Sequence, residues 1–491
     1  MKFKLRPFFK DIFLTFITQA VILIAFFFIY RLIAVNFGPE GVGEYSLIKR
    51  IIAFLQPVLL LGLGIGIPRY IAMSQNREQR SGYIKAGGLV VAIFSFVFLT
   101  FINLFKDYFA KLFFGTADYS NLVLPFSLFL AGLTLHALVY SYFRGRLFVK
   151  TFNFFQIINL ALVPLIILIF FKNITIEKLI TLIGITTFVV AFIFSLFLVK
   201  ELFVPIKKWQ FFKPFKELFQ YSLPRVPAIF AWQGLLSLGP ILAIHFTSIR
   251  EVGYLSVGQS LLGTVGAAIA PLGLIILPKV STLIVNGRQE VIKENLNFLL
   301  GAILQCSVFI CFQLIIFTDV IVEYWLGSEF SGAISIMRIV FLAVFFYALF
   351  EAMRNILDAV KVKPINTINL FISLGVFLII GGILLFLIEL FSPIISLSIA
   401  LTSAISCLGT LTYNSIRKIY PEKLKKDLNY LWIAVLINVL LGSIAIFAKS
   451  FVVSKFYYLV LFEVLVGVIY LSILWFLKME WIREIPKRIL S

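Results

Sequence analysis

The sequence predicts an all-α integral membrane protein with about fourteen transmembrane helices. The chain of 491 residues is 61% hydrophobic and only 13% charged, with a mean hydropathy of +1.05. A soluble protein of this size would need far more polar surface to cover its core. Apolar runs of about 20 residues, the length that crosses ~30 Å of hydrocarbon as a helix, recur along the chain. No sustained apolar/polar alternation of the β-barrel type occurs, so the spans are expected to be helical.

The expected spans follow one another with short connections that leave no room for a separate soluble domain. They cover roughly residues 12–35, 45–66, 83–105, 122–142, 152–171, 177–200, 219–246, 253–276, 297–318, 333–357, 364–388, 392–416, 429–447 and 456–477. The first is too long for a cleaved signal peptide and is expected to be a true span. All three cysteines, Cys306, Cys311 and Cys407, lie inside expected spans, which argues against a disulfide framework.

The formal net charge of +20 is distributed asymmetrically between the two sides of the predicted membrane. When connections are numbered alternately from a cytoplasmic N-terminus, the inner set carries 31 Lys and Arg residues and the outer set 7. Cytoplasmic connections of membrane proteins carry such an excess. The count therefore predicts a multi-pass protein of the cytoplasmic membrane with both termini in the cytoplasm. It also accounts for the basic excess without a nucleic-acid partner.

A weak internal repeat appears when the chain is shifted by 210 positions. "VGEYS" at Val42–Ser46 falls on "VGYLS" at Val252–Ser256, and Arg144 falls on Arg354. The repeat pairs spans 1–6 with spans 7–12, and because six is even, both halves enter the membrane in the same sense. We therefore expect a parallel repeat of two six-helix lobes facing a central cavity, plus two extra C-terminal helices.

This repeat predicts four segments. They are an N-lobe at 1–200, a cytoplasmic amphipathic linker at 201–218, a C-lobe at 219–416, and the last two helices with a cytoplasmic tail at 417–491. The linker combines basic and aromatic residues, as expected of a helix in the headgroup region.

A charged stripe ends the tenth expected span. Glu351, Arg354 and Asp358 fall within about 60° of one another on a helix. A charge facing lipid near the bilayer centre costs about 2.5–3.5 kcal/mol, so the stripe should face protein or water. Two interpretations remain open, a hydrated cavity near its cytoplasmic mouth or an ion pair that fixes a helix end. Arg144 and Arg146 are the pseudo-symmetric cations of that mouth.

Other cations lie within expected spans, where carboxylates are scarcer. They are Arg31, Lys49, Arg50 and Arg338 toward the outer end and Arg225 toward the inner end. Ser222, Arg225 and Trp232 share a helical face that suits sugar and phosphate, although core packing is the alternative for Trp232. A cavity with surplus Arg and Lys attracts an anionic cargo, and Arg binds phosphate bidentately. The "GLGIG" break at Gly62–Gly66 is either a hinge or a packing kink.

Two stretches resemble signatures of oligosaccharide flippases. They are "FIYRLIAVNFGPEGVGEYSL", which joins the first two spans, and "RNILDAVKVKPINTINL", which joins spans 10 and 11. The family is the Wzx-type polysaccharide-export branch of the multidrug/oligosaccharidyl-lipid/polysaccharide (MOP) superfamily. The resemblance implies a V-shaped two-lobe transporter for an undecaprenyl-diphosphate-linked oligosaccharide, used in O-antigen, lipopolysaccharide or other polysaccharide biosynthesis. It carries over Arg31 and Arg354 as functional candidates, and a polysaccharide polymerase and export machinery as partners besides membrane lipids.

Related classes fit these residues less well. Lipid II flippases usually begin with an Arg-rich first helix, which this chain lacks. Multidrug or metabolite antiporters, the alternative function, usually need a membrane-buried carboxylate in the N-lobe, whereas Asp11 stands at the entrance of span 1. An enzyme is not expected, since there is no catalytic acidic motif and no phosphate-binding P-loop. His136 and His245 fall in different lobes, so neither a metal site nor a cofactor is expected.

Overall fold

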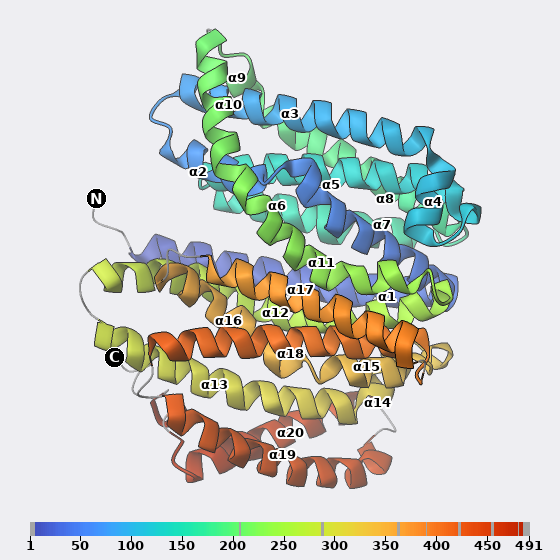
Figure 1. The fold of residues 1–491 in the computed structure, drawn as a ribbon, viewed down its shortest axis with the longest axis vertical. Helices are drawn as coiled ribbons and strands as arrows, with labels where there is room; N and C mark the ends of the chain where they lie inside the picture. Colours follow the sequence, from blue (N-terminus) through green and yellow to red (C-terminus); the bar gives the residue numbers. More distant parts are fainter. Residues whose placement is uncertain are drawn as a thin grey trace. The chain divides into compact units, whose positions relative to one another are not determined.

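Helices form every regular element in the part of the chain that the computed structural model describes (Figure 1). The described backbone comprises residues 5–205, 208–285, 289–360, 364–388, 390–420, 424–452, 456–479 and 481–484. The all-α prediction is therefore confirmed. The chain forms two compact units, Met1–Ser256 (unit 1) and Val257–Ser491 (unit 2). Lys361 and Lys363, which follow the charged stripe, lie outside the described residues.

Unit 1 contains eleven α-helices and the beginning of a twelfth within the described ranges. They are α1 (Leu5–Leu60), α2 (Leu63–Met73), α3 (Arg77–Leu104), α4 (Lys106–Phe114), α5 (Val123–Gly145), α6 (Val149–Ile157), α7 (Val163–Phe170), α8 (Ile176–Ser195), α9 (Val199–Leu202), α10 (Lys208–Ser222), α11 (Val226–Ala243) and α12 (Ile249–Val285), which continues into unit 2. Short 3-10 or π turns join several of them. Unit 1 extends to Ser256 and so includes α10 and α11, which the sequence places in the linker and the C-lobe. This division into compact units does not test the predicted lobe boundaries, which stay predictions.

Unit 2 continues with eight further α-helices in its described ranges. They are α13 (Gln289–Ile316), α14 (Thr318–Trp325), α15 (Ala333–Phe341), α16 (Val344–Val360), α17 (Ile365–Ile383), α18 (Pro393–Ile419), α19 (Leu424–Val452) and α20 (Phe456–Phe476). α18 packs against α16 and α17, with Gly409 so close to Phe346 that an added Cβ would meet its carbonyl oxygen at 2.6 Å. α19 packs on α13, and Gln305 of α13 accepts hydrogen bonds from Trp481 at 2.6 Å and Tyr470 at 2.9 Å.

The helices are apolar on the outside, as a bilayer requires. Among the described residues, 11 helices are long and apolar enough to cross a membrane, or up to 12 when the bent pair α15–α16 is one span. α1 covers two expected spans, and the apolar helix Leu431–Phe447 is shorter, so the predicted count of fourteen is compatible. Phe96, Phe170 and Phe476 are 73%, 76% and 81% exposed. Such side chains would be unfavourable in water and are natural in hydrocarbon.

The first two expected spans form one kinked helix. The connection expected near residues 36–44 is helical except at Gly38, whose φ of 64° and ψ of −166° bend α1 just before Pro39. Glycine adopts a positive φ without the penalty that a Cβ would bring. The break therefore takes one residue, and no open loop separates the two spans.

The two copies of the repeated motif meet inside unit 1. A Cβ on Gly43 of α1 would lie 2.0 Å from the carbonyl oxygen of Ile249, and one on Gly253 would lie 3.0 Å from the Gly43 Cα. Glu40 and Arg250, also 210 positions apart, form an exposed ion pair at 3.3 Å. The glycines shared by "VGEYS" and "VGYLS" thus allow the motif to pack on its own copy.

The predicted linker helix α10 packs against α2 and α3. Its Leu218 is fully buried in the core of unit 1 beside Gly66 and Gly87, whereas Phe212 and Lys216 are exposed. One buried and one exposed face agree with an amphipathic helix. Its predicted place in the headgroup region stays a prediction.

Candidate functional site

The "GLGIG" segment ends α1 and forms a docking place for the start of α11. Leu61 and Gly62 both have positive φ, and α2 begins at Leu63. A Cβ on Gly62 would lie 2.4 Å from the carbonyl oxygen of Ser222, and one on Gly66 would lie 2.1 Å from the Ser222 hydroxyl. Glycine at Gly62 leaves room for the Ser222 backbone, and glycine at Gly66 leaves room for the side chain of Ser222, which is fully buried. The break is therefore a packing site.

Docking of Ser222 brings two arginines onto one tyrosine. Arg69 of α2 donates a hydrogen bond to the Tyr221 hydroxyl at 2.9 Å, and its guanidinium carbon lies 4.3 Å from the ring centroid. The Arg225 guanidinium carbon lies 3.6 Å from the same centroid, so the two carbons are within about 8 Å of each other. Arg225 also donates to the Tyr221 carbonyl oxygen. Arg69, Tyr221 and Arg225 are called the Tyr221 cluster below.

The Tyr221 cluster carries a net positive charge. Within the described ranges, neither Arg69 nor Arg225 forms an ion pair with a carboxylate. Arg69 is exposed and Arg225 is half-buried. Two guanidinium groups that are held against a ring and form no ion pair with an acid are well placed to bind a phosphate group.

A cavity of about 650 Å³ with a mixed polar and apolar lining adjoins this cluster where α2, α3 and α10 meet. Its lining comprises Tyr70, Met73, Ser74, Asn76, Glu78, Gln79, Tyr83, Lys213, Pro214 and Glu217. The Tyr70 ring packs on Tyr83 at 4.9 Å and edge-on against Tyr221 at 5.8 Å. The Tyr83 hydroxyl donates to Glu217. Tyr70 therefore belongs to the wall of the cavity and also contacts the Tyr221 cluster.

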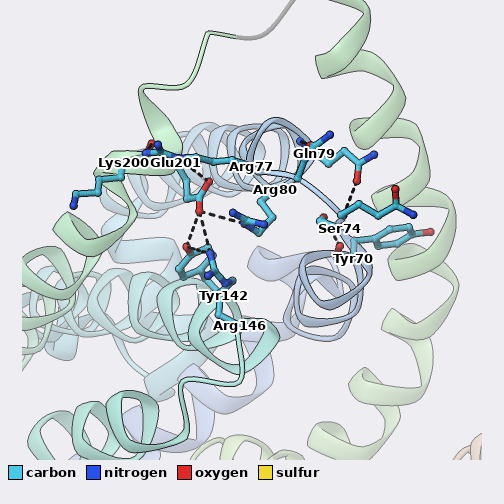
Figure 2. A network of polar contacts seen from close by, with 11 residues as sticks. Tyr70, Ser74, Arg77, Gln79, Arg80, Tyr142, Arg146, Lys200 and Glu201 are labelled. Atoms are coloured by element: carbon cyan, nitrogen blue, oxygen red, sulfur yellow. Dashed lines mark hydrogen bonds and ion pairs between the residues drawn. The ribbon is translucent and has the colours of Figure 1, made fainter. Parts of the chain in front are cut away.

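A second charged cluster surrounds Glu201 of α9 (Figure 2). Its carboxylate lies 3.1 Å from Arg146, 3.2 Å from Arg80 and 3.7 Å from Arg77, and it accepts a hydrogen bond from Tyr142 at 3.3 Å. Glu201 is only 5% exposed. This arrangement, the Glu201 cluster, holds the ends of α3, α5 and α9 together. Arg146, a predicted mouth cation, is thus paired, whereas Arg144 is exposed.

Lys49 lies among aromatic rings of α1. Its Nζ is 5.4 Å from the centroid of Tyr45, 5.9 Å from that of Tyr30 and 6.0 Å from that of Phe26. These distances are in the range of cation–π attraction. Ser46 is hydrogen-bonded to the Tyr30 hydroxyl at 3.2 Å, which fixes one wall. Lys49 is half-buried and has no carboxylate partner in the described part of the chain.

The remaining predicted cations of unit 1 differ in their surroundings. Arg50 donates to the carbonyl oxygens of Leu236 at 3.2 Å and Ser256 at 3.4 Å, and so ties α1 to α11 and α12. Arg31 and Trp232 are half-buried, in α1 and α11. Arg50 thus has an evident structural role, whereas cargo contact by Arg31 and Trp232 stays a prediction.

In unit 2 the predicted stripe forms a connected polar group. Arg354 pairs with the buried Glu351 at 3.0 Å. Asn366 of α17 donates to the Asp358 carboxylate at 2.7 Å and to the Arg354 carbonyl oxygen at 2.8 Å. The structure therefore contains the helix-end ion pair of one interpretation. A hydrated cavity at this stripe stays a prediction.

Arg338 of α15 is exposed and makes structural contacts. It donates to the Ile315 carbonyl oxygen at 3.2 Å and lies 3.8 Å from Asp319. Asp319 also binds Lys449 of α19 at 2.5 Å. These contacts connect α13, α14, α15 and α19.

The two histidines differ: His136 is a buried residue of α5, whereas His245 is exposed in the turn after α11, so its prediction as a packed helix residue is wrong. His136 shares a hydrogen bond of 3.0 Å with Asn159 and stacks on Phe155, with ring centroids 4.2 Å apart. His245 contacts the Leu112 carbonyl oxygen at 3.1 Å. No group of three or more possible metal ligands occurs among the described residues.

Sequence reasoning missed Arg69, Tyr221 and Glu201. In the sequence, Arg69 is one of the cations of the predicted cytoplasmic connections. The sequence contains one local signal for Arg69. It follows Gly66 by three residues, so on a helix it lies about one turn beyond the glycine that contacts Ser222. Nothing in the local sequence marks Tyr221 or Glu201.

Comparison with known proteins identifies the fold. No protein-family model and no curated protein sequence matches the chain. Among solved structures, the lipid II flippase MurJ in an inward closed conformation is similar with a TM-score of 0.75 and 15% identity, over 95% of this chain and 99% of that one.

Two transporter structures extend the comparison. An inward-facing multidrug resistance MATE family transporter of the MOP superfamily has a TM-score of 0.66 and 13% identity, over 81% of this chain and 94% of that one. A MOP superfamily transporter from Pyrococcus furiosus, described as having a binding pocket of reversed polarity, has a TM-score of 0.58 and 12% identity, over 84% and 95%. The chain therefore has the fold of MOP-superfamily transporters.

Proposed function

We propose that this protein is a flippase that moves an undecaprenyl-diphosphate-linked oligosaccharide from the inner to the outer leaflet of the cytoplasmic membrane. The observation that carries this proposal is the fold match to a lipid II flippase, which leaves almost no part of either chain uncovered. The multidrug transporter covers 81% of this chain. The flippase signatures at residues 28–47 and 354–370 point to an oligosaccharide as the lipid-linked group.

Electrostatics support an anionic cargo. Lys49, Arg69 and Arg225 lack carboxylate partners in the described part of the chain. Cations without an acidic partner attract anions and raise their local concentration. A drug that is itself a cation would be repelled by the same groups, so the charge pattern favours a diphosphate cargo.

The proposed mechanism is alternating access through a cationic cavity. The diphosphate would bind the cations, the sugars would occupy water, and the prenyl tail would stay in lipid. The charge asymmetry of the connections supports cytoplasmic termini and loading from the cytoplasmic leaflet. A polysaccharide polymerase and export machinery would take up the translocated product.

Reconstitution tests the proposal directly. The purified protein is placed in liposomes with a panel of polyprenyl-diphosphate-linked short oligosaccharides, and a membrane-impermeant glycosidase measures how fast the sugars cross. We expect protein-dependent equilibration for at least one oligosaccharide, and none in protein-free vesicles. Rates equal to those of protein-free vesicles for the whole panel would refute the function.

An ion-coupled antiporter for drugs or metabolites is the second candidate, favoured by the likeness to multidrug transporters. The same liposomes distinguish it. Efflux of a fluorescent drug that depends on a proton or sodium gradient, without any movement of lipid-linked sugar, would support this candidate and exclude the first.

A further inference from the structure

We infer that the Tyr221 cluster binds the diphosphate of the cargo and that the adjoining cavity receives the sugar attached to it. This inference rests on the proposed function and specifies its head-group site. The site lies wholly within unit 1 and is formed by residues of α2, α3, α10 and the turn that precedes α11.

The cluster has the donors that a diphosphate needs. A guanidinium carries five N–H donors in a planar fork. Arg69 uses one for the Tyr221 hydroxyl and Arg225 one for the Tyr221 carbonyl, and no other acceptor engages them in the described chain. The remaining donors suffice for bidentate contacts to two phosphate groups. The two guanidinium carbons are at most about 8 Å apart, so both groups can reach the two linked phosphates of one diphosphate.

The cluster is pre-organised before any ligand arrives. Tyr221 precedes Ser222, whose backbone packs against Gly62 and whose side chain packs against Gly66. Both arginines pack on the Tyr221 ring, which restricts rotamers that would otherwise be lost on binding. Tyr221 is therefore a positioning residue, and the arginines are the contacts.

The charged residues in the cavity lining carry a net negative charge, opposite to that of the cluster. Glu78 and Glu217 outnumber Lys213, and Gln79, Tyr70 and Tyr83 line the same cavity. Figure 2 shows Tyr70 and Gln79 beside the Glu201 cluster. Carboxylate and amide groups accept hydrogen bonds from sugar hydroxyls, and tyrosine rings offer apolar faces to sugar rings. Since carboxylates repel phosphate, a glycosyl diphosphate would bind in one orientation, with its sugar past Tyr70. A volume of about 650 Å³ is ample for such a group.

Binding of inorganic pyrophosphate to the full-length protein in nanodiscs of neutral lipid tests the anion site. We expect Arg69→Gln and Arg225→Gln each to weaken binding about tenfold and the double variant to abolish it. Arg69→Lys and Arg225→Lys should give intermediate values, because the charge stays and the fork is lost. Tyr221→Phe should retain more affinity than Tyr221→Leu, which removes the ring.

Lys216→Gln is the matched control, since Lys216 is exposed on α10, five residues from Tyr221. It removes one positive charge from the same helix and should leave affinity unchanged. Equal pyrophosphate affinity in the wild type and the double variant, with both correctly folded by thermal unfolding, would overturn the inference.

Two further measurements distinguish the diphosphate of the cargo from a phospholipid headgroup as the ligand of this site. Flipping of the lipid-linked oligosaccharide should fall with pyrophosphate affinity across the variants. If phosphatidylglycerol in the nanodisc displaces pyrophosphate while the double variant flips cargo at the wild-type rate, the site binds phospholipid headgroups and its assignment to cargo is wrong. If the wild type binds pyrophosphate through these arginines but flips no lipid-linked sugar, the anion site stands and the proposed function fails.

The sugar half has its own readout. Glu78→Gln and Gln79→Ala should weaken binding of a soluble sugar diphosphate by severalfold and leave pyrophosphate affinity unchanged. Equal loss for both ligands would contradict the placement of the sugar in the cavity.

Discussion

At the scale of residues, the arginines of unit 1 differ in whether a carboxylate lies beside them. Three arginines share Glu201, which is buried among them, whereas Arg69 and Arg225 have a tyrosine ring instead of an acid. In the first arrangement each arginine has the same acidic partner, and the shared carboxylate joins helices. The second leaves its charge available. Residue type alone does not distinguish the two groups of arginines, but their partners do.

Glu201→Gln should destabilise unit 1. Removing a buried carboxylate leaves Arg80 and Arg146 facing each other without compensation. Because these arginines are 18% and 29% exposed, we expect a loss at the low end of the range for buried pairs, about 3 kcal/mol or roughly 6–12 °C in Tm. Thermal unfolding in detergent measures it. Glu177→Gln, which alters an exposed contact to Asn121, should change Tm little; equal shifts would contradict a special role of Glu201.

Charge exchange at the Glu351–Arg354 pair separates transport from folding. Arg354→Glu should abolish glycan export, because it places a second acid beside the buried Glu351. The double exchange Glu351→Arg with Arg354→Glu restores an ion pair and should recover the Tm. If Arg354 contacts cargo, export stays low in the double exchange. Full recovery of export would show that only the ion pair matters.

At the scale of elements, close glycine contacts determine which helices meet. Gly62 and Gly66 admit Ser222, Gly43 and Gly253 admit one another, and Gly132 and Gly184 allow α5 to pack along α8. Small residues let helix backbones approach in membranes, where apolar side chains gain little from burial against each other rather than lipid. The "GLGIG" segment is therefore important for helix docking.

Gly62→Ala should release the turn that precedes α11. Gly62 has φ +73°, where an L-residue costs about 1–2 kcal/mol, and the new Cβ would also collide with the Ser222 carbonyl oxygen. We expect a lower Tm and weaker pyrophosphate binding, since Tyr221 moves with Ser222. Gly64→Ala is the control in the same motif, because its Cβ would meet only the Ser141 hydroxyl, at 4.0 Å. Similar effects from both variants would refute the docking role of Gly62.

At the scale of the whole molecule, the polarity of the surface and the fold agree. Large apolar side chains lie exposed on both units, while many polar ones are buried. The MOP-superfamily fold explains this pattern, because its helices are solvated by lipid on the outside.

Membrane potential should affect transport by the intact molecule. A cargo with two negative charges that leaves a negative interior gains about 4–5 kcal/mol per 100 mV. In liposomes with a potassium diffusion potential, we expect net transfer of lipid-linked oligosaccharide away from the negative side, and a reversed bias when the potential is reversed. Transfer that is independent of potential would show that the step is electrically neutral or coupled to a compensating ion.

The helical spans could be predicted from the sequence because span length and hydropathy are properties of contiguous residues. Every expected span is mostly helical in the described ranges, and the pairing of Glu351 with Arg354 follows from their spacing on one helix. The repeat was visible through Val42–Ser46 and Val252–Ser256, although nothing in it showed that the two copies pack on each other.

The sequence by itself thus determined the membrane class, the helices and the motif that repeats. Only the tertiary structure decided which charges meet. Arg69 and Tyr221 are 152 positions apart, and Arg146 and Glu201 are 55 apart. The physical reason is that hydropathy is summed along the chain, whereas the partner of a charged group is set by how helices pack, and close contacts at a few glycines determine that packing.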